Sequence, residues 1–144
     1  MSDRDDFLAW VGTRLTEAET ALHNGDASPR RAIWSRHEPV TVLGAWKSAT
    51  GQQEVDDLFG SLEKTFADCT SYEYEVVAAD VVGDMAYTVG YEHTAASWDG
   101  TPLDPYTLRV THTYRREDGE WKIAHRHADS PPINRTFPVD ASTA

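Results

Sequence analysis

Three histidines and two arginines near the carboxyl-terminal end of the chain have the side-chain types and the spacing for proton-transfer chemistry. His125, Arg126 and His127 are consecutive, and Arg109 and His112 lie on the segment that precedes them. An imidazole titrates near neutral pH and can act as a general base or acid, while a guanidinium offers several N–H donors to an oxygen. The sequence therefore predicts groups for moving a proton and for holding a polar oxygen.

The elements that must position these side chains are two strands joined by a tight turn. Residues 106–129 are rich in β-branched and aromatic residues, and Asp118-Gly119 is typical of a two-residue hairpin turn. Because such a turn fixes the register, it predicts which residues share a face of the sheet. One predicted face carries Leu108, Val110 opposite His127, His112 opposite His125, Tyr114 opposite Ile123, and Trp121. The other predicted face carries Arg109, Thr111 opposite Arg126, Thr113 opposite Ala124, Lys122 and Ala128.

The histidine-bearing face is open to three interpretations. His112, His125 and His127 could converge on a zinc ion and leave a coordination position for water. His125 or His127 could instead act as a general base without a metal, and we favour this interpretation because no fourth zinc ligand is evident. The histidines could also be polar members of an outer sheet face that forms a dimer. We accordingly predict catalytic roles for His127 and His125, and neither a metal nor a cofactor.

Composition limits the functional classes. The 144 residues suffice for one domain, and 13 basic against 24 acidic residues give a formal net charge of −11. An acidic protein is a poor partner for nucleic acid or an anionic membrane, because both carry negative charge. Cys69 is the only cysteine, and the N-terminus lacks the pattern of a signal peptide, so we expect a cytoplasmic location.

Upstream of the hairpin, the pattern of apolar residues predicts helices followed by strands. Helical spacing is found over residues 3–24, in a short segment opened by Ser28-Pro29, and over residues 52–67. A short strand is expected over residues 40–43, and alternation with a period of two extends over residues 71–82 and 85–96. Helices segregated from an antiparallel sheet indicate the α+β class. We predict one domain over residues 1–132 and an extended or disordered tail over residues 133–144.

Six short segments distributed along the chain form a recognisable set. They are Asn24-Gly25-Asp26, Pro39-Val-Thr-Val-Leu-Gly44, Gly83-Asp84-Met85-Ala86-Tyr87, Leu108-Arg109-Val110-Thr111, Asp118-Gly119-Glu120-Trp121-Lys122-Ile123 and His125-Arg126-His127. As a set they resemble the SnoaL-like branch of the ketosteroid isomerase and nuclear transport factor 2 superfamily. The resemblance implies a cystatin-like cone, in which a curved antiparallel sheet wraps around N-terminal helices and leaves a pocket at the open end. It also implies a homodimer through the outer sheet face.

The positions of the superfamily's known catalytic groups are substituted in this sequence. The resemblance places Ala18, Gly44 and Thr111 near the tyrosine, the general-base aspartate and the second acid of ketosteroid isomerases. Arg126 falls near the pocket aspartate of SnoaL-like cyclases and related epoxide hydrolases. Arg109 matches the pocket-facing arginine of the association domain of calmodulin-dependent protein kinase. Steroid isomerisation in its usual form is therefore not expected.

From the resemblance we predict a pocket in which Arg109 anchors a ligand oxygen, Tyr91, Arg126 and Thr111 assist, and Trp46 forms a wall. This prediction turns the face with Arg109 inward, so the more apolar histidine face must be buried by a second subunit. We expect a small-molecule pocket protein, in the form of a cofactor-free isomerase, cyclase or dehydratase acting on a compound with a carbonyl or anionic oxygen. The alternative is a non-catalytic dimeric binding or assembly module.

Overall fold

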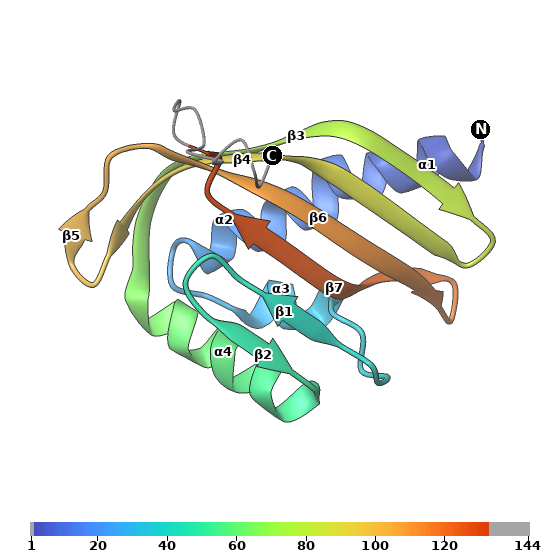
Figure 1. The fold of residues 1–144 in the computed structure, drawn as a ribbon, viewed down its shortest axis with the longest axis horizontal. Helices are drawn as coiled ribbons and strands as arrows, with labels where there is room; N and C mark the ends of the chain where they lie inside the picture. The colour runs from blue at the N-terminus through green and yellow to red at the C-terminus, as the bar shows by residue number, and fades with distance from the viewer. Residues whose placement is uncertain (1, 133–144) are drawn as a thin grey trace, which may run out of the picture.

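The computed structural model describes residues 2–132, in which helices lie against one side of a single curved sheet (Figure 1). The N-terminal rod consists of α1 (Asp3–Trp10), the π-helical turn η1 (Val11–Leu15) and α2 (Thr16–Leu22). The Ser2 hydroxyl caps the rod by accepting a hydrogen bond from the Asp5 backbone N–H at 3.1 Å. Gly25 follows the rod with a φ of +89°, a left-handed conformation that reverses the chain. The helix predicted over residues 3–24 is thus confirmed, with its end at Leu22.

Two further helices and the strands of a seven-stranded sheet complete the part of the chain that is described. They are α3 (Ser28–Ile33), β1 (Thr41–Leu43), β2 (Ser48–Thr50), α4 (Gln52–Thr65), β3 (Phe66–Val82), β4 (Met85–Trp98), β5 (Thr101–Pro102), β6 (Tyr106–Glu117) and β7 (Glu120–Asp129). The sheet order is β2-β1-β7-β6-β4-β3, with β5 paired to β4. All pairs are antiparallel except β1 and β7, which are parallel. The predicted α+β fold with a curved sheet around N-terminal helices is confirmed, whereas β2 and β5 were not predicted because both are too short to show a period.

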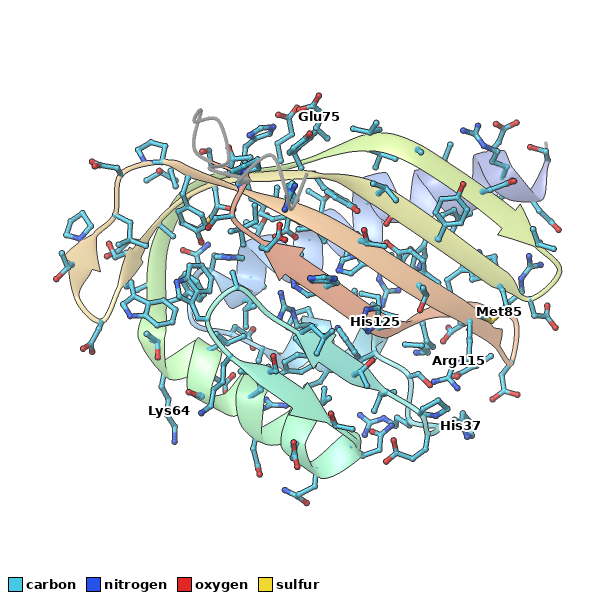
Figure 2. All side chains as sticks on the ribbon, in the orientation of Figure 1. His37, Lys64, Glu75, Met85, Arg115 and His125 are labelled. Carbon is cyan, nitrogen blue, oxygen red and sulfur yellow. The ribbon has the colours of Figure 1, made fainter. Side chains whose placement is uncertain are left out.

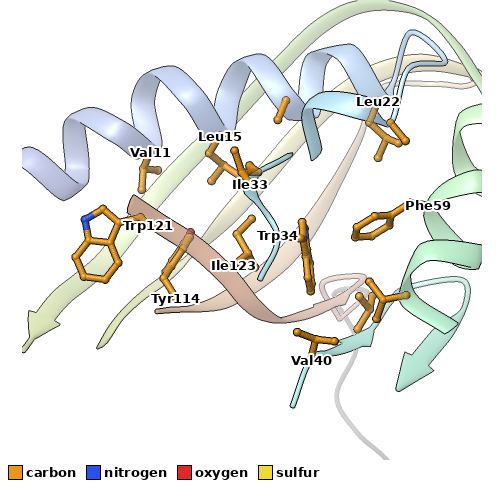
Figure 3. Packing of buried hydrophobic residues seen from close by; sticks show 14 of the residues in the cluster. Val11, Leu15, Leu22, Ile33, Trp34, Val40, Phe59, Tyr114, Trp121 and Ile123 are labelled. Atoms are coloured by element: carbon orange, nitrogen blue, oxygen red, sulfur yellow. The ribbon is translucent and has the colours of Figure 1, made fainter. Parts of the chain in front are cut away.

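The core lies between the helices and the inner face of the sheet (Figure 3). Phe7 of the rod packs edge-on against Tyr114 and Trp121, with ring centroids 4.8 and 5.1 Å apart. Further along, Trp34 meets Phe59 of α4 at 5.1 Å. The more apolar face of the C-terminal hairpin therefore forms the core of the monomer itself, and the prediction that a second subunit buries it is wrong.

A β-bulge in β7 changes the register of the C-terminal hairpin midway. Tyr114 pairs with Ile123 as predicted, but the next pair joins Thr113 to His125, which leaves Ala124 as an extra residue. The predicted opposition of His112 to His125, and with it that of Val110 to His127, is therefore wrong. Because Ile123 and Ala124 both turn inward, every later residue of β7 is displaced to the opposite face from the predicted one.

None of the helices described between residues 2 and 132 is long and apolar enough to cross a lipid bilayer. The tail predicted over residues 133–144 lies outside the described residues.

Candidate functional site

A cavity of about 180 Å³ lies between the end of the rod, α4 and the loop that joins β1 to β2. Its apolar lining residues are Leu22, Val42, Ala45, Leu58, Leu62, Phe66, Trp98 and Leu108. Trp46 lines the mouth, with 52% of its surface exposed and its ring centroid 5.2 Å from that of Trp98. The polar lining residues are His23, Arg30, Lys47, Ser61, Thr65 and Arg126. An apolar cavity with a few polar groups is the usual form of a small-molecule site.

His23 reaches the cavity because it ends the N-terminal rod. It is the C-terminal cap of α2, and its backbone N–H donates to the carbonyl of Glu19 at 3.1 Å. The turn that follows is held to β3, since the side-chain oxygen of Asn24 accepts a hydrogen bond from the Cys69 backbone N–H at 2.9 Å. A Cβ on Gly25 would lie 3.2 Å from the Glu63 carbonyl oxygen, so this close approach also favours glycine. The turn therefore fixes the position of the histidine.

The contacts of the His23 ring determine its chemical state. Nδ1 lies 2.6 Å from the Glu19 carbonyl oxygen, which can only accept, so Nδ1 carries the hydrogen and the lone pair of the neutral ring is on Nε2. The ring lies 4.4 Å from Phe66 and 5.8 Å from Tyr72, measured between centroids. Burial lowers the pKa of His23, with the Glu19 charge opposing this effect. A neutral imidazole with a free lone pair at the wall of an apolar cavity is suited to general-base chemistry.

Both arginines of the cavity are paired with buried carboxylates. Arg30 donates from Nε to Glu19 at 2.7 Å and makes a second contact with the same carboxylate through Nη2. Arg126 donates to Glu92 from Nη1 at 3.0 Å and from Nη2 at 2.7 Å, a bidentate pair. Arg126 Nη1 also lies 3.7 Å from Glu19, which links the two pairs, and the Tyr72 hydroxyl donates to Glu92 at 2.6 Å. The floor of the cavity is therefore close to electrically neutral.

The pKa shifts agree with this pairing. Burial alone would raise the pKa of Glu92, but the adjacent Arg126 guanidinium holds that pKa well below its usual value. Burial would likewise lower the pKa of Arg126, and Glu92 raises it instead. Both groups remain charged over the physiological range of pH.

A chain of polar side chains extends from Arg126 along the inner face of the sheet. Arg126 Nη1 donates to Nε2 of His112 at 3.2 Å, because a guanidinium cannot accept. Nδ1 of His112 then donates to the Tyr114 hydroxyl at 3.0 Å, which is 2.8 Å from Thr88 Oγ1. The Tyr74 hydroxyl closes the chain, 2.9 Å from Thr88 Oγ1. Burial lowers the pKa of His112 well below its usual value, and Arg126 adds to the effect, so His112 is a neutral link that orients Arg126.

Comparison with known proteins assigns the chain to a family. The sequence model described as the SnoaL-like domain matches residues 11–134, which is most of the chain. The chain belongs to the SnoaL-like family. No functionally curated protein is similar enough in sequence to be matched.

Solved structures similar to this SnoaL-like chain share its fold at low sequence identity. A candidate dehydratase of the NTF2-like family from Streptomyces avermitilis has a TM-score of 0.71 and 18% identity, covering 90% of this chain and 99% of its own. An NTF2-like superfamily protein from Salmonella enterica serovar Typhimurium has a TM-score of 0.71 and 17% identity, with 90% and 97% covered. A protein with a cystatin-like fold from Caulobacter vibrioides has a TM-score of 0.67 and 17% identity, with 96% and 98% covered. At these identities the similarity establishes the fold alone.

Four of the predicted site residues of this SnoaL-like chain lie on the outer face of the sheet, away from the cavity. Arg109, Tyr91, Thr111 and His127 line a separate outer groove of about 280 Å³. Arg109 is engaged in an exposed bidentate pair with Asp129, at 2.7 and 2.9 Å. The prediction that Arg109 points into the pocket is therefore wrong, because alternation along β6 places it opposite to the buried Leu108 and Val110.

His125 also lies on the outer face, where its Nδ1 is 2.6 Å from Thr41 Oγ1 of β1 (Figure 2). Burial lowers the pKa of His125, and His127 adds to the effect. Because His112 is on the inner face, the three histidines do not converge, and no group of three or more potential metal ligands is found within residues 2–132. Of the predicted residues, the structure brings only Arg126 and Trp46 to the cavity.

Sequence reasoning did not identify His23, Glu19, Arg30 or Glu92 as residues of the site. A signal was present in Glu19 and His23, which are one helical turn apart and lie in phase with the apolar Leu15 and Leu22. Charged or polar residues on the apolar side of a helix indicate a buried polar cluster. Ile123-Ala124 was a second signal, since two adjacent apolar residues interrupt the alternation of β7.

Proposed function

We propose that the cavity binds a compact, uncharged molecule with a carbonyl oxygen, and that His23 moves a proton on this molecule without a cofactor. The observation that carries the proposal is the state of His23. Its Nδ1–H is held by a backbone carbonyl, and its Nε2 has no hydrogen-bond partner among the described residues. A base of this kind beside an apolar cavity supports isomerisation or dehydration, because general acid–base groups can carry both reactions without a redox cofactor.

The pairing of the cationic groups favours an uncharged ligand over the anion that the sequence suggested. Arg30 and Arg126 are each satisfied in charge by a buried carboxylate, so an incoming anion would have to approach Glu19 and Glu92 in a medium that screens poorly. A carbonyl oxygen carries no such penalty. Among the described residues, Nη1 of Arg30 and Nε of Arg126 have no acceptor, and these N–H groups can donate to it.

In the proposed reaction His23 removes a proton and later returns it, while Arg30 or Arg126 donates to the carbonyl oxygen. Nε2 of His23 removes a proton from the carbon next to the carbonyl, and the electron pair of the C–H bond moves toward the oxygen. The N–H donors of Arg30 or Arg126 stabilise the negative charge that develops there. The imidazolium then returns the proton, either to another carbon, which completes an isomerisation, or to a leaving hydroxyl, which departs as water.

Binding of a matched pair of ligands tests the proposal. Acetophenone and benzoate have similar size and shape, but only benzoate is charged at pH 7. We expect acetophenone to shift the indole NMR signals of Trp46 and Trp98, and benzoate to have a much smaller effect. Leu58→Trp, which fills the cavity, should abolish the shifts, whereas Val89→Trp on the outer face should preserve them. Tighter binding of benzoate, or acetophenone shifts that persist in Leu58→Trp, would contradict the proposal.

The outer sheet face supports a second candidate function, assembly of two copies of the chain. Its exposed apolar residues include Val77 at 62%, Met85 at 49%, Tyr87 at 42% and Val89 at 39% of their surface. Apolar residues grouped on one face are typical of an interaction surface. We propose a homodimer through this face, in a protein of the cytoplasm. Light scattering after gel filtration should give twice the chain mass, and Tyr87→Asp together with Val89→Asp should give the monomer. A dimer that binds no small molecule would favour the non-catalytic assembly module.

A further inference from the structure

Glu19 accepts two hydrogen bonds from His23 through its backbone carbonyl, and its buried carboxylate stands one helical turn before His23 on α2. We propose that Glu19 is a positioning residue for His23: its carbonyl selects the ring tautomer, and its carboxylate stabilises the charge that the ring gains with a proton. This inference rests on the proposed role of His23 as the proton carrier. It identifies Glu19 as the residue that prepares His23 for this role.

The backbone contribution is a pair of hydrogen bonds to one oxygen. The Glu19 carbonyl accepts from the His23 backbone N–H at 3.1 Å and from Nδ1 at 2.6 Å. A carbonyl oxygen has two lone pairs, so the Glu19 oxygen can accept from the backbone N–H and from the ring at the same time. This contact does not depend on the side chain at position 19, and it keeps the lone pair on Nε2.

The side-chain contribution is a carboxylate that cannot move away. Glu19 is 1% exposed, and Arg30 holds both of its oxygens. Buried ion pairs of this kind are often no more stabilising than apolar residues of the same volume. Stability alone therefore does not account for a buried charge at this position, and its effect on the neighbouring imidazole is the role that we infer.

Charged and titratable groups face His23 from every element packed around it: Glu19 on α2, Arg30 on α3, Tyr72 on β3, Glu92 on β4 and Arg126 on β7. Burial keeps the ring neutral at rest by lowering its pKa. The carboxylates of Glu19 and Glu92 oppose burial, and Arg30 acts in the same direction as burial. Burial has the largest effect on the pKa of His23, and among the charged groups Glu19 opposes it most strongly, ahead of Glu92.

Long-range ¹H–¹⁵N NMR of the imidazole nitrogens tests both parts of the inference on the full chain. In the wild-type protein we expect the Nδ1–H tautomer for His23. In Glu19→Gln we expect the same tautomer, because the carbonyl remains, with the pKa of His23 lower by about one pH unit. Glu117→Gln is the matched control, since Glu117 is a mostly buried carboxylate that contacts Ser35 and Arg115 instead, and it should leave the pKa of His23 unchanged.

If Glu19→Gln does not fold because Arg30 is left unpaired, the double variant Glu19→Gln with Arg30→Gln removes both charges. We expect the pKa of His23 to remain below that of wild type in this variant, by a smaller shift. An Nε2–H tautomer in the wild-type protein would overturn the backbone part, and an unchanged or higher pKa in these variants would overturn the side-chain part. The NMR result is independent of any ligand, so failure to bind acetophenone would overturn the proposed function and leave this inference standing.

Discussion

Arg126 and Arg109 lie on neighbouring strands and each pairs with a carboxylate. Because one pair is buried and the other exposed, they contribute differently to the stability of the fold. Arg126 is buried and pairs with Glu92, which is 1% exposed. Arg109 pairs with Asp129 at the surface, where water and salt weaken the attraction. The loss of stability on removing one partner depends on the surroundings of the charge that remains. A lone buried carboxylate is costly, while a lone exposed one is hydrated.

Replacing each arginine by methionine should distinguish the buried ion pair from the exposed one. We expect Arg126→Met to lower the free energy of unfolding by about 3–5 kcal/mol, because Glu92 is left as an uncompensated buried charge. Arg109→Met should have little effect. Urea unfolding monitored by tryptophan fluorescence measures both variants. Similar losses in the two variants would show that the inward placement of Arg126 is wrong.

The buried histidines predict how stability depends on pH. Burial lowers the folded-state pKa values of His23 and His112 below the 6.5 of a free histidine side chain. The unfolded chain therefore binds more protons than the folded protein below about pH 6.5, so stability is complete above this value and falls as the pH falls. Each proton contributes up to about 1.4 kcal/mol per pH unit.

We expect the free energy of unfolding to be lower at pH 5.5 than at pH 7.5. Most carboxylates titrate below pH 5.5, so they contribute little to this difference. Urea titrations at the two pH values measure the difference. His112→Gln should reduce the difference, although it lowers stability at both values because Arg126 and Tyr114 lose a partner. Equal stability of the wild-type protein at the two pH values would contradict the neutral state of the buried rings.

At the scale of elements, β3 and β4 pack tightly at one of the two irregularities in their pairing. Val76 pairs with Gly90 and Ala78 with Val89, so Val77 is the extra residue. A Cβ on Gly90 would lie 2.2 Å from the Glu75 carbonyl oxygen and 2.9 Å from the Tyr74 ring. The bulge thus requires a residue without a side chain on the opposite strand.

Alanine at Gly90 and at Gly12 should have opposite effects. Gly90→Ala forces the strands apart and should lower the free energy of unfolding by about 1–3 kcal/mol. A Cβ on Gly12 meets nothing within 4 Å, and Gly12 is in the middle of the rod, so Gly12→Ala should raise stability by about 0.5–1 kcal/mol. Thermal and urea unfolding measure both. A wild-type stability for Gly90→Ala would contradict the tight pairing at the bulge.

The elements themselves were largely predictable, and the bulges explain most of the differences. Apolar periodicity indicated the rod, α4 and the long strands, because each is long enough to repeat its pattern several times. A bulge adds one residue to one strand and leaves the composition unchanged, so a turn-based register is correct only up to that residue. The register predicted from Asp118-Gly119 is therefore correct from Arg116 and Trp121 to Tyr114 and Ile123, and wrong beyond Ala124.

At the scale of the whole molecule, the helices cover the inner face of the sheet, and the outer face is left with exposed apolar and charged side chains (Figures 1 and 2). Met85 lies at the tip of the β3–β4 hairpin on this outer side, while Arg115 reaches the loop that carries His37, donating to its carbonyl at 2.7 Å. The apolar pattern of β6 indicated correctly which face is the core. The resemblance to a pocket arginine indicated the opposite face, and it misplaced Arg109.

The candidate site was harder to predict than the fold. Its lining comes from α2, α3, α4, β1, the β1–β2 loop, β3, β4, β6 and β7, and most of these elements contribute only one or two residues. No single segment therefore has a motif for the site. Trp46 and Arg126 were identified because they stand out in their own segments, whereas His23 becomes prominent only when Glu19, Phe66 and Tyr72 are placed around it.

The most direct test of the central claim is the exchange of the methyl protons of acetophenone for deuterium, followed by ¹H NMR in D₂O near pH 7. These protons are next to the carbonyl, so their exchange reports removal of a proton by a base. We predict that the wild-type protein accelerates the exchange, that His23→Gln reduces it to the rate of buffer alone, and that His127→Gln on the outer face behaves as wild type. Exchange that survives in His23→Gln, or no acceleration by a wild-type protein that binds acetophenone, would contradict the assignment of His23 as the base of this cavity.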